Sequence, residues 1–241
     1  MPDAIFAHHR LAPLYDAFDG PRDDLTPYLA LADDLDARSI VDIGCGTGAL
    51  AILLAESGRG VVAVDPASAS LEVAKSKAGA HRITWLHGDA TTLPPAAADL
   101  ALMTGNVAQV FLTDEAWSQT LHSIHSALRP EGHLVFETRR PDRRAWEDWA
   151  AAAPITIDIP GIGRVEERLE LIAVELPYVS FRHTYTFRSD GTAITSDSTL
   201  RFRPRGELES TLAAHGFTVR DVRQAPDRPE REFVFIAKRG N

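Results

Sequence analysis

The sequence predicts an α/β fold, with a mostly parallel sheet covered by helices on both faces and a small antiparallel β insertion late in the chain. Three observations lead to this prediction. From residue 25 to residue 138, apolar strand-like segments alternate with helix-like segments. A glycine-rich stretch follows the first of these strands. From residue 154 to residue 203 apolar and polar residues alternate in short segments, which is typical of a sheet with one exposed face.

The first part of the chain is predicted to form βαβ units. Strand candidates stand at 39–43, 60–65, 83–87, 99–104 and 133–138, and helix candidates at 25–37, 48–57, 67–78 and 114–128. Strands that alternate with helices pair in parallel, because each helix carries the chain back across a face of the sheet. The carboxyl ends of these strands should therefore lie along one edge, where ligands bind.

The second part of the chain reads differently. The pair Asp190-Gly191, between two alternating segments, predicts a hairpin. A helix is expected at 205–214, with Gly216 at its end, and strands at 217–222 and 232–238 close the chain. We expect residues 154–203 to be inserted between the fifth and sixth strands of the main sheet and to cover the ligand cleft. Such strands leave edges that need cover, so a homodimer is a further expectation.

Composition and charge narrow the function classes. With 241 residues we expect a single domain, 1–241, and a net charge of −9 disfavours tight binding to a phosphate backbone. One cysteine excludes an intrachain disulfide and a cysteine-based zinc site, and the histidines form no tight ligand pair such as H-E-x-x-H, so we expect no metal. Without a signal-peptide pattern or an apolar run of membrane length, the expected location is cytoplasmic.

The stretch VDIGCGTGAL, Val41–Leu50, is the most informative segment, because it lies where a strand ends and a helix begins. Glycines there let the backbone turn tightly and a ligand approach, and the start of the helix offers free N–H groups. Asp42 precedes the glycines, Asp65 ends the next strand and Asp89 follows the third. These features predict a nucleotide-containing cofactor, although Asp42 and Asp89 could also accept hydrogen bonds from nearby backbone N–H groups.

Two cofactors compete for this loop. Gly44, Gly46 and Ala49 satisfy the looser dinucleotide pattern G-x-G-x-x-G/A. Asp42 would repel a pyrophosphate, whereas S-adenosylmethionine has no phosphate and carries a sulfonium and an ammonium. Asp65 can accept hydrogen bonds from the ribose of either cofactor, and Asp89 from an adenine amino group. The acids therefore favour S-adenosylmethionine.

The surrounding motifs resemble those of a known family. VDIGCGTG, VVAVDPA, HGDATTLP, DLALMTGNVAQVF and LRPEGHLVFETR have the order and spacing of the motifs in class I S-adenosylmethionine-dependent methyltransferases. The resemblance covers Ser39 to Arg139 and touches LAPLYDAF and RFRPRGELESTLAAHGF. It implies a Rossmann-like seven-stranded sheet whose last strand is antiparallel. It also implies an enzyme that transfers a methyl group from S-adenosylmethionine to an unidentified small molecule.

The resemblance assigns roles to the matched residues. The glycine loop would contact the methionine part of the cofactor, Asp65 the ribose, and Asp89 with the backbone of Ala90 the adenine. Residues 104–106 would line the methyl-donor pocket, and Tyr15 would close over the cofactor. The positions expected to bind the cofactor are Tyr15, Asp42, Gly44, Cys45, Gly46, Gly48, Asp65, Pro66, Asp89, Ala90, Thr104 and Asn106.

The expected domain organisation follows from these assignments. Residues 1–38 form an N-terminal helical cap segment, 39–140 the cofactor-binding core, and 154–203 an insertion that covers the substrate. After the fourth strand the chain reads TGNV, where enzymes that methylate exocyclic base amines carry an Asn/Asp-Pro-Pro-aromatic run. We therefore expect no nucleic acid partner.

The motifs assign no catalytic residue, because their acids are committed to the cofactor. Candidates for a base are His8, His9, Asp16 and His183, and Arg139 could bind an anionic acceptor. Two alternatives stay open. The first is a non-catalytic regulatory module that binds S-adenosylmethionine, and the second is an NAD(P)-dependent oxidoreductase.

Overall fold

A seven-stranded sheet forms the centre of the molecule, in a computed structural model that describes residues 2–96 and 98–240. The strand order is β10-β11-β5-β4-β1-β2-β3. β11 runs antiparallel to both neighbours, as predicted for the last strand, whereas the pairs among β1 to β5 are parallel. The strands are β1 (Ser39–Ile43), β2 (Gly60–Asp65), β3 (Ile83–His87), β4 (Ala98–Met103), β5 (Leu128–Arg139), β10 (Phe217–Arg223) and β11 (Glu232–Arg239).

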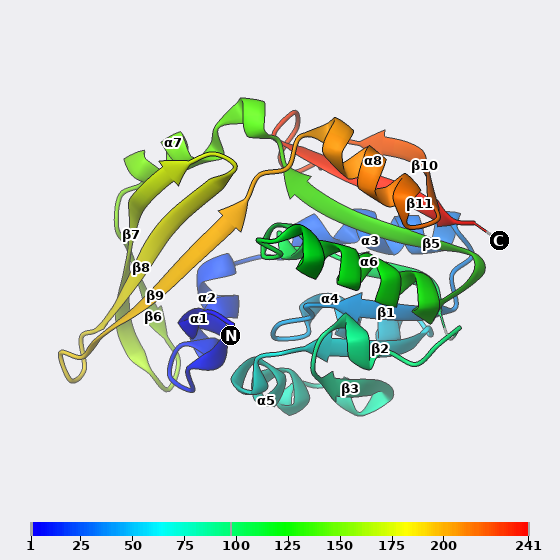
Figure 1. The fold of residues 1–241 in the computed structure, drawn as a ribbon. Coiled ribbons are helices and arrows are strands. Elements are labelled where there is room, and N and C mark those ends of the chain that lie inside the picture. The colour runs from blue at the N-terminus through cyan, green and yellow to red at the C-terminus, as the bar shows by residue number, and fades with distance from the viewer. Residues whose placement is uncertain (1, 97, 241) are drawn as a thin grey trace.

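Helices cover both faces of this sheet (Figure 1). Neighbouring residues on a strand point to opposite faces, so Ile40 packs with Leu54 in one apolar cluster and Val41 with Trp117 in the other. This explains why the strands are continuous apolar runs. The helices of this part are α3 (Thr26–Asp34), α4 (Ala49–Glu56), α5 (Ser68–Ser76), α6 (Asp114–Ala127) and α8 (Arg205–Ala214).

A second, four-stranded sheet lies beside the main one. Its order is β6-β7-β8-β9 and every pair is antiparallel, which confirms the predicted β insertion. Gly191, with φ +73°, stands in the turn between β8 and β9. The strands are β6 (Ile155–Ile159), β7 (Gly163–Glu175), β8 (Tyr178–Phe187) and β9 (Ala193–Arg201), and they follow β5 and α7 (Ala145–Ala151) in the chain.

The first part of the N-terminal segment, residues 2–19, lies between the two sheets (Figure 1). Ile5 and Leu14 pack against Tyr185 and Phe187 of the insertion sheet, while the Ser70 hydroxyl of α5 donates to the carbonyl oxygen of Phe6 at 2.9 Å. This segment holds α1 (Ala4–Ala7) and α2 (Tyr15–Asp19). Short 3-10 turns are Ala12–Leu14, Asp23–Leu25, Ala80–Arg82, Ala90–Thr92, Val107–Gln109 and Pro141–Arg143.

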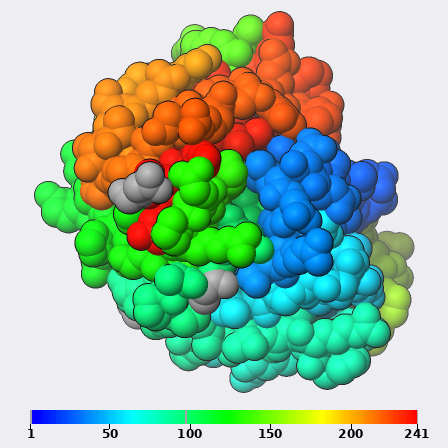
Figure 2. All heavy atoms as spheres, turned by 90° about the vertical axis from the view of Figure 1, so that its right-hand side faces the viewer, coloured from blue at the N-terminus to red at the C-terminus, as the bar shows by residue number. Residues whose placement is uncertain are grey.

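Figure 2 views the molecule from the right-hand side of Figure 1. It shows the C-terminal segments in orange and red above the green of the central chain, and the blue-green segments below. This arrangement follows the strand order, in which β10 and β11 lie at one end of the sheet and β3 at the other. Across residues 2–96 and 98–240, no helix has the length and apolarity that a membrane crossing requires.

Candidate functional site

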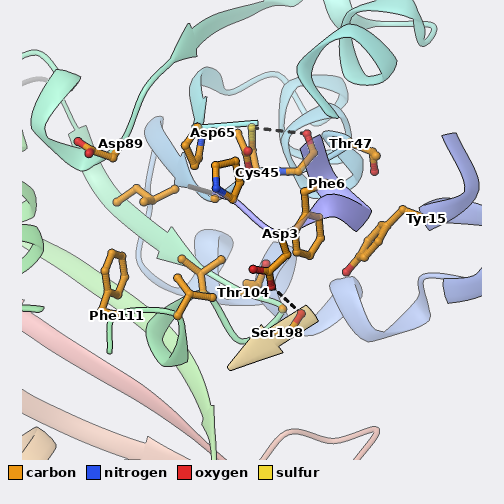
Figure 3. A pocket seen from close by; sticks show the side chains of 18 of the residues that line it. Asp3, Phe6, Tyr15, Cys45, Thr47, Asp65, Asp89, Thr104, Phe111 and Ser198 are labelled. Atoms are coloured by element: carbon orange, nitrogen blue, oxygen red, sulfur yellow. Dashed lines mark hydrogen bonds between the residues drawn. The ribbon is translucent and has the colours of Figure 1, made fainter. Parts of the chain in front are cut away.

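A cavity of about 770 Å³ lies between the carboxyl ends of the parallel strands and the insertion sheet (Figure 3). Two sets of residues line it. The core wall comes from the ends of β1 and β2 and the segments that follow β1, β2, β3 and β4, and it includes Asp42, Gly44, Cys45, Gly46, Asp65, Pro66, Asp89 and Thr104. The cover wall comes from the N-terminal segment, the loop after residue 109 and the insertion sheet, and includes Asp3, Phe6, Tyr15, Phe111, Phe181 and Ser198.

The three glycines after β1 serve different purposes. All three have positive φ, +69° at Gly44, +52° at Gly46 and +79° at Gly48. A Cβ at Gly44 would collide with Val107, and one at Gly48 would collide with the ring of Trp85. A Cβ at Gly46 would meet nothing within 4 Å. Packing therefore requires Gly44 and Gly48, whereas the open space at Gly46 belongs to the cavity, which Gly48 does not line.

Asp65 organises this loop. Its Oδ2 accepts a hydrogen bond from the Gly46 N–H at 2.8 Å, and its Oδ1 accepts one from the Ala67 N–H at 2.8 Å. Burial raises the pKa of its carboxyl, while these two hydrogen bonds lower it. Each carboxylate oxygen can accept a second hydrogen bond, so Asp65 can hold the loop and a ribose hydroxyl at once.

Asp42 is the most deeply buried acid of the core wall, with 2% of its surface exposed. Its Oδ2 has no hydrogen-bond partner among the described residues. Burial, and then the nearby negative charge of Asp65, raise the pKa of Asp42 from 3.8 to about 7. A buried acceptor without a partner is costly, so this position suits a ligand that brings a positive charge.

The N-terminal segment is tied to the glycine loop through Asp16. The buried Thr47 hydroxyl donates to Asp16 Oδ1 at 2.5 Å, and Lys77 pairs with the same carboxylate. Tyr15, next in the chain, lines the cavity, and its ring centroid lies 5.4 Å from that of Phe6. Burial raises the pKa of Tyr15 to about 12, so its hydroxyl stays protonated.

The residues after β3 and β4 complete the core wall. Asp89 is exposed, lines the cavity, and caps the next turn by accepting from the Thr91 N–H at 2.9 Å; Ala90 behind it is buried. Thr104 and Gly105 line the cavity, and the Gly105 N–H donates to Glu137 Oε1 at 2.6 Å. Asn106 has φ +69° and does not line the cavity; its buried Oδ1 lacks a partner among the described residues.

The proposed base candidates and Arg139 lie outside the cavity lining. His8 and His9 stack on one another, and His183 Nδ1 lies 2.7 Å from Glu167 Oε1. Arg139 lies over the ring of Trp149, 5.0 Å from its centroid, and its Nε is 3.7 Å from Glu232. The structure therefore engages these side chains in packing and polar contacts of their own.

Several lining residues were missed by the sequence reasoning. Asp3, Phe6, Phe111 and Ser198 stand in no motif, and 195 positions separate Asp3 from Ser198, whose hydroxyl donates to it at 2.6 Å. Helix α1 has four residues, too few for a helical period to be visible. The alternation of apolar and polar residues in β8 and β9, with the Asp190-Gly191 pair between them, indicated a sheet at this position.

The segment that carries most of the core wall is similar to a known protein family. The family model described as a methyltransferase domain matches residues 40–132, which include β1 to β4 and the loops of the core wall. This part of the chain is a domain of the class I S-adenosylmethionine-dependent methyltransferase type. An uncharacterised methyltransferase of Oceanobacillus iheyensis is 34% identical over 97 residues, which cover 40% of this chain and 45% of the relative. The chain spans about half the length of the curated relatives it matches.

Solved structures of methyltransferases share the fold over almost the whole chain. The CcbJ methyltransferase of Streptomyces caelestis has a TM-score of 0.78 at 18% identity, covering 96% of each chain. CalS10 of Micromonospora echinaspora, an amino pentose methyltransferase solved with S-adenosylmethionine bound, has a TM-score of 0.68 at 18% identity and covers 90% of this chain and 92% of its own. At these identities the likeness shows the fold.

The core wall of this methyltransferase domain suits S-adenosylmethionine, the methyl donor of the family. Asp42 offers a buried, partnerless oxygen to a cationic ligand, and Asp65 keeps hydrogen-bonding capacity for ribose hydroxyls. The space above Gly46 is open. Asp42, Gly46 and Asp65 are the residues that would hold the cofactor.

Proposed function

We propose that this chain is an enzyme that transfers a methyl group from S-adenosylmethionine to a small-molecule acceptor. The observation that carries the proposal is the continuous cavity that the core wall and the cover wall share. Its volume of about 770 Å³ lies within the range of small-molecule sites. A regulatory module would need the core wall alone, whereas a transferase needs space for a second molecule beside the cofactor.

The proposed division of labour follows the two walls. Residues 39–140 hold the cofactor, while the N-terminal segment 1–38 and the insertion 154–203 cover the acceptor. The hydroxyl of Ser198 on β9 and the ring of Phe181 on β8 line the cover wall, which supports a role of the insertion in acceptor binding. Deletion of the insertion, residues 154–203, should weaken acceptor binding more than cofactor binding.

We propose that the enzyme catalyses methyl transfer mainly by aligning the acceptor atom with the methyl group of the cofactor. S-adenosylmethionine supplies a methyl group on a positively charged sulfur, which is an activated leaving group. The chain's task is to hold the acceptor atom in line and to keep water out, which can lower a barrier by about 7–11 kcal/mol at best. The cover wall does this with side chains such as Phe6 and Phe111, which make the cavity partly apolar.

Two measurements test the proposal. Calorimetry at pH 8, where Asp42 with its pKa of about 7 is mostly ionised, should show binding of S-adenosylmethionine and no binding of NAD, because the charged carboxylate would repel a pyrophosphate. Incubation with methyl-labelled S-adenosylmethionine and pools of small molecules should transfer the label to an acceptor. Tight binding without transfer to any pool would favour the regulatory module, and binding of NAD alone would favour an oxidoreductase.

We also propose that the chain has no nucleic acid partner, is located in the cytoplasm and forms a homodimer. The acidic net charge of −9 supports the absence of a nucleic acid partner. A homodimer is supported by large apolar side chains exposed on the β7–β8 hairpin outside the cavity, among them Val174 at 41% and Leu176 at 60% exposed. Sedimentation velocity should show a dimer, and Leu176→Asp should shift it to monomer; a wild-type monomer would contradict this proposal.

A further inference from the structure

Among the described residues that line the cavity, every cationic side chain is already paired with a carboxylate, so none is free to bind an anionic acceptor. Seven charged side chains line it: Asp3, Arg22, Asp42, Asp65, Asp89, Arg182 and Asp197. Both arginines are neutralised by carboxylates. Arg182 makes two hydrogen bonds to Asp197, at 2.5 and 2.7 Å. Arg22 makes two to Asp24 at 3.0 Å each and an ion pair with Asp19 at 2.8 Å. A phosphate or carboxylate would find repulsion here.

Two acids of the cover wall line the cavity: Asp197, which pairs with Arg182, and Asp3. Its Oδ2 accepts the Ser198 hydroxyl at 2.6 Å, and no cationic side chain of the described residues pairs with it. Asp3 is the N-cap residue that precedes helix α1, yet its side chain makes no capping hydrogen bond. Figure 3 shows the carboxylate pointing into the cavity beside Phe6. The usual structural role of an aspartate at this position is therefore not used.

The structure holds this carboxylate in place from two sides. The Ile5 N–H donates to the buried Ser196 hydroxyl of β9 at 2.9 Å, and the Ser70 hydroxyl of α5 donates to the Phe6 carbonyl at 2.9 Å. These bonds fasten residues 3–6 to the insertion sheet and to the core at once. A fixed carboxylate loses little conformational freedom when it binds a ligand.

The surroundings of Asp3 are suited to a cation with an apolar body. Aromatic rings of Phe6, Tyr15, Phe111 and Phe181 line the same cavity. Ring faces attract ammonium groups, and a carboxylate forms a strong charge-assisted hydrogen bond with them.

We propose that Asp3 binds the ammonium group of the acceptor, and that the acceptor is a small amine with an apolar body. The inference rests on the proposed function and goes beyond it by naming the acceptor class and the residue that selects it. Burial raises the pKa of Asp3 above its ordinary value, although the Ser198 hydrogen bond and the N-terminal ammonium partly offset it, and a bound ammonium would lower it further, since opposite charges favour the ionised form.

The test uses three probes of matched shape and different charge. Calorimetry on the full chain saturated with S-adenosylhomocysteine compares 2-phenylethylamine, 2-phenylethanol and 3-phenylpropanoate. The amine should bind about tenfold or more tightly than the alcohol, and the propanoate most weakly. Asp3→Asn should lower the affinity for the amine by about tenfold and leave the affinity for the alcohol within about twofold.

The control is Asp34→Asn, which removes one negative charge from an exposed position on α3 and should leave all three affinities unchanged. Equal binding of the three probes, loss of amine and alcohol affinity alike in Asp3→Asn, or no binding of the amine at about 10 mM would each overturn the inference. Circular dichroism and an unchanged affinity for S-adenosylhomocysteine confirm that the variant is folded. Failure of S-adenosylhomocysteine to bind the wild type would instead defeat the proposed function.

Discussion

The two walls of the cavity are built on different principles. The core wall is made of loops at the carboxyl ends of parallel strands, where backbone groups and buried carboxylates such as Asp42 and Asp65 face the cavity. The cover wall is made of side chains from an antiparallel sheet and a short N-terminal segment, and its Arg182–Asp197 pair is half exposed. One wall is fixed by the path of the chain, and the other by the side chains placed on it.

This difference explains why the family model matches the core wall, although the fold is shared over almost the whole chain. The family model matches residues 40–132 and ends before the insertion begins. A glycine loop that must pass Val107 and Trp85 tolerates few substitutions, because a Cβ at Gly44 or Gly48 has no room. A side chain on β8 or β9 can change without moving the sheet. We infer that the cofactor site is constrained and the acceptor site is adjustable.

The largest expected effect is at the centre of the core wall. Gly46→Val should reduce the affinity for S-adenosylmethionine by at least about a hundredfold, because its side chain would occupy the cavity. The positive φ adds a stability cost of about 1–3 kcal/mol. Gly191→Val is the matched control, since Gly191 also has positive φ and open space but lies in the β8–β9 turn. Equal cofactor affinity in the two variants would remove Gly46 from the site.

Asp42 gives the core wall a pH dependence. With a pKa of about 7 in the free protein, ionised Asp42 should make S-adenosylmethionine bind about tenfold more tightly at pH 8 than at pH 6. Asp42→Asn should remove this difference and bind weakly at both values. Calorimetry at pH 6 and pH 8 measures both affinities. If Asp42→Asn still binds the cofactor about tenfold more tightly at pH 8, another group is responsible for the pH dependence.

The raised pKa of Asp42 also affects stability, but in the opposite direction: cofactor affinity should rise with pH, whereas the stability of the cofactor-free protein should fall. Because the folded pKa lies above the ordinary value of 3.8, the folded protein binds more protons than the unfolded chain between pH 3.8 and about 7. The contribution of Asp42 to the free energy of unfolding therefore falls as pH rises through that window. Without cofactor, Asp42→Asn should be more stable than the wild type at pH 8, by a few kcal/mol at most. Urea titrations at pH 5 and pH 8 measure the difference.

Asp65 should have a smaller effect than Gly46. Asp65→Ala should weaken cofactor binding by about 1–3 kcal/mol, since one or two hydrogen bonds are lost. The variant also frees the N–H groups of Gly46 and Ala67, so Asp65→Asn, which keeps one acceptor oxygen, should lose less. If cofactor affinity hardly changes, Asp65 only holds the backbone of the turn and does not bind the cofactor.

The smallest effects are expected at the base candidates, which lie outside the cavity lining. Once the labelled assay has identified an acceptor, His8→Gln, His9→Gln, Asp16→Asn and His183→Gln should each slow single turnover by less than about tenfold, whereas loss of a true base costs about a hundred- to ten-thousandfold. A thousandfold loss in one variant, with cofactor affinity retained, would identify that residue as the base and defeat catalysis by position alone.

Much of the core wall could be predicted from the sequence, because its signals are local. The turn at Gly44–Gly48 follows from a strand, glycines and a helix within ten residues, and the cofactor was named from Asp42, Asp65 and Asp89. The antiparallel insertion was predicted from period-two alternation and from Asp190-Gly191. Each of these patterns is contained in one short stretch of chain.

The cover wall could not be predicted, because tertiary packing brings its members together. Asp3 and Ser198 meet only when α1 docks on β9, and Phe111 lies in a loop whose sequence carries no motif. Arg139 was expected at the ligand edge from its place after the fifth strand, yet the direction of its side chain depends on Trp149 and Glu232. Strand position indicates an edge, whereas the neighbours decide what a side chain contacts.

The amides of Gly46 and Gly105 are each bound to a buried carboxylate, Asp65 at 2.8 Å and Glu137 at 2.6 Å. Loop amides at a cavity rim ordinarily exchange with deuterium quickly, but these two can exchange only when their carboxylates release them. Their exchange rates would therefore measure how often the loop after β1 and the loop after β4 open locally. If both rates slow together on adding S-adenosylhomocysteine, the loops after β1 and β4 open as one unit; if one slows alone, they open independently.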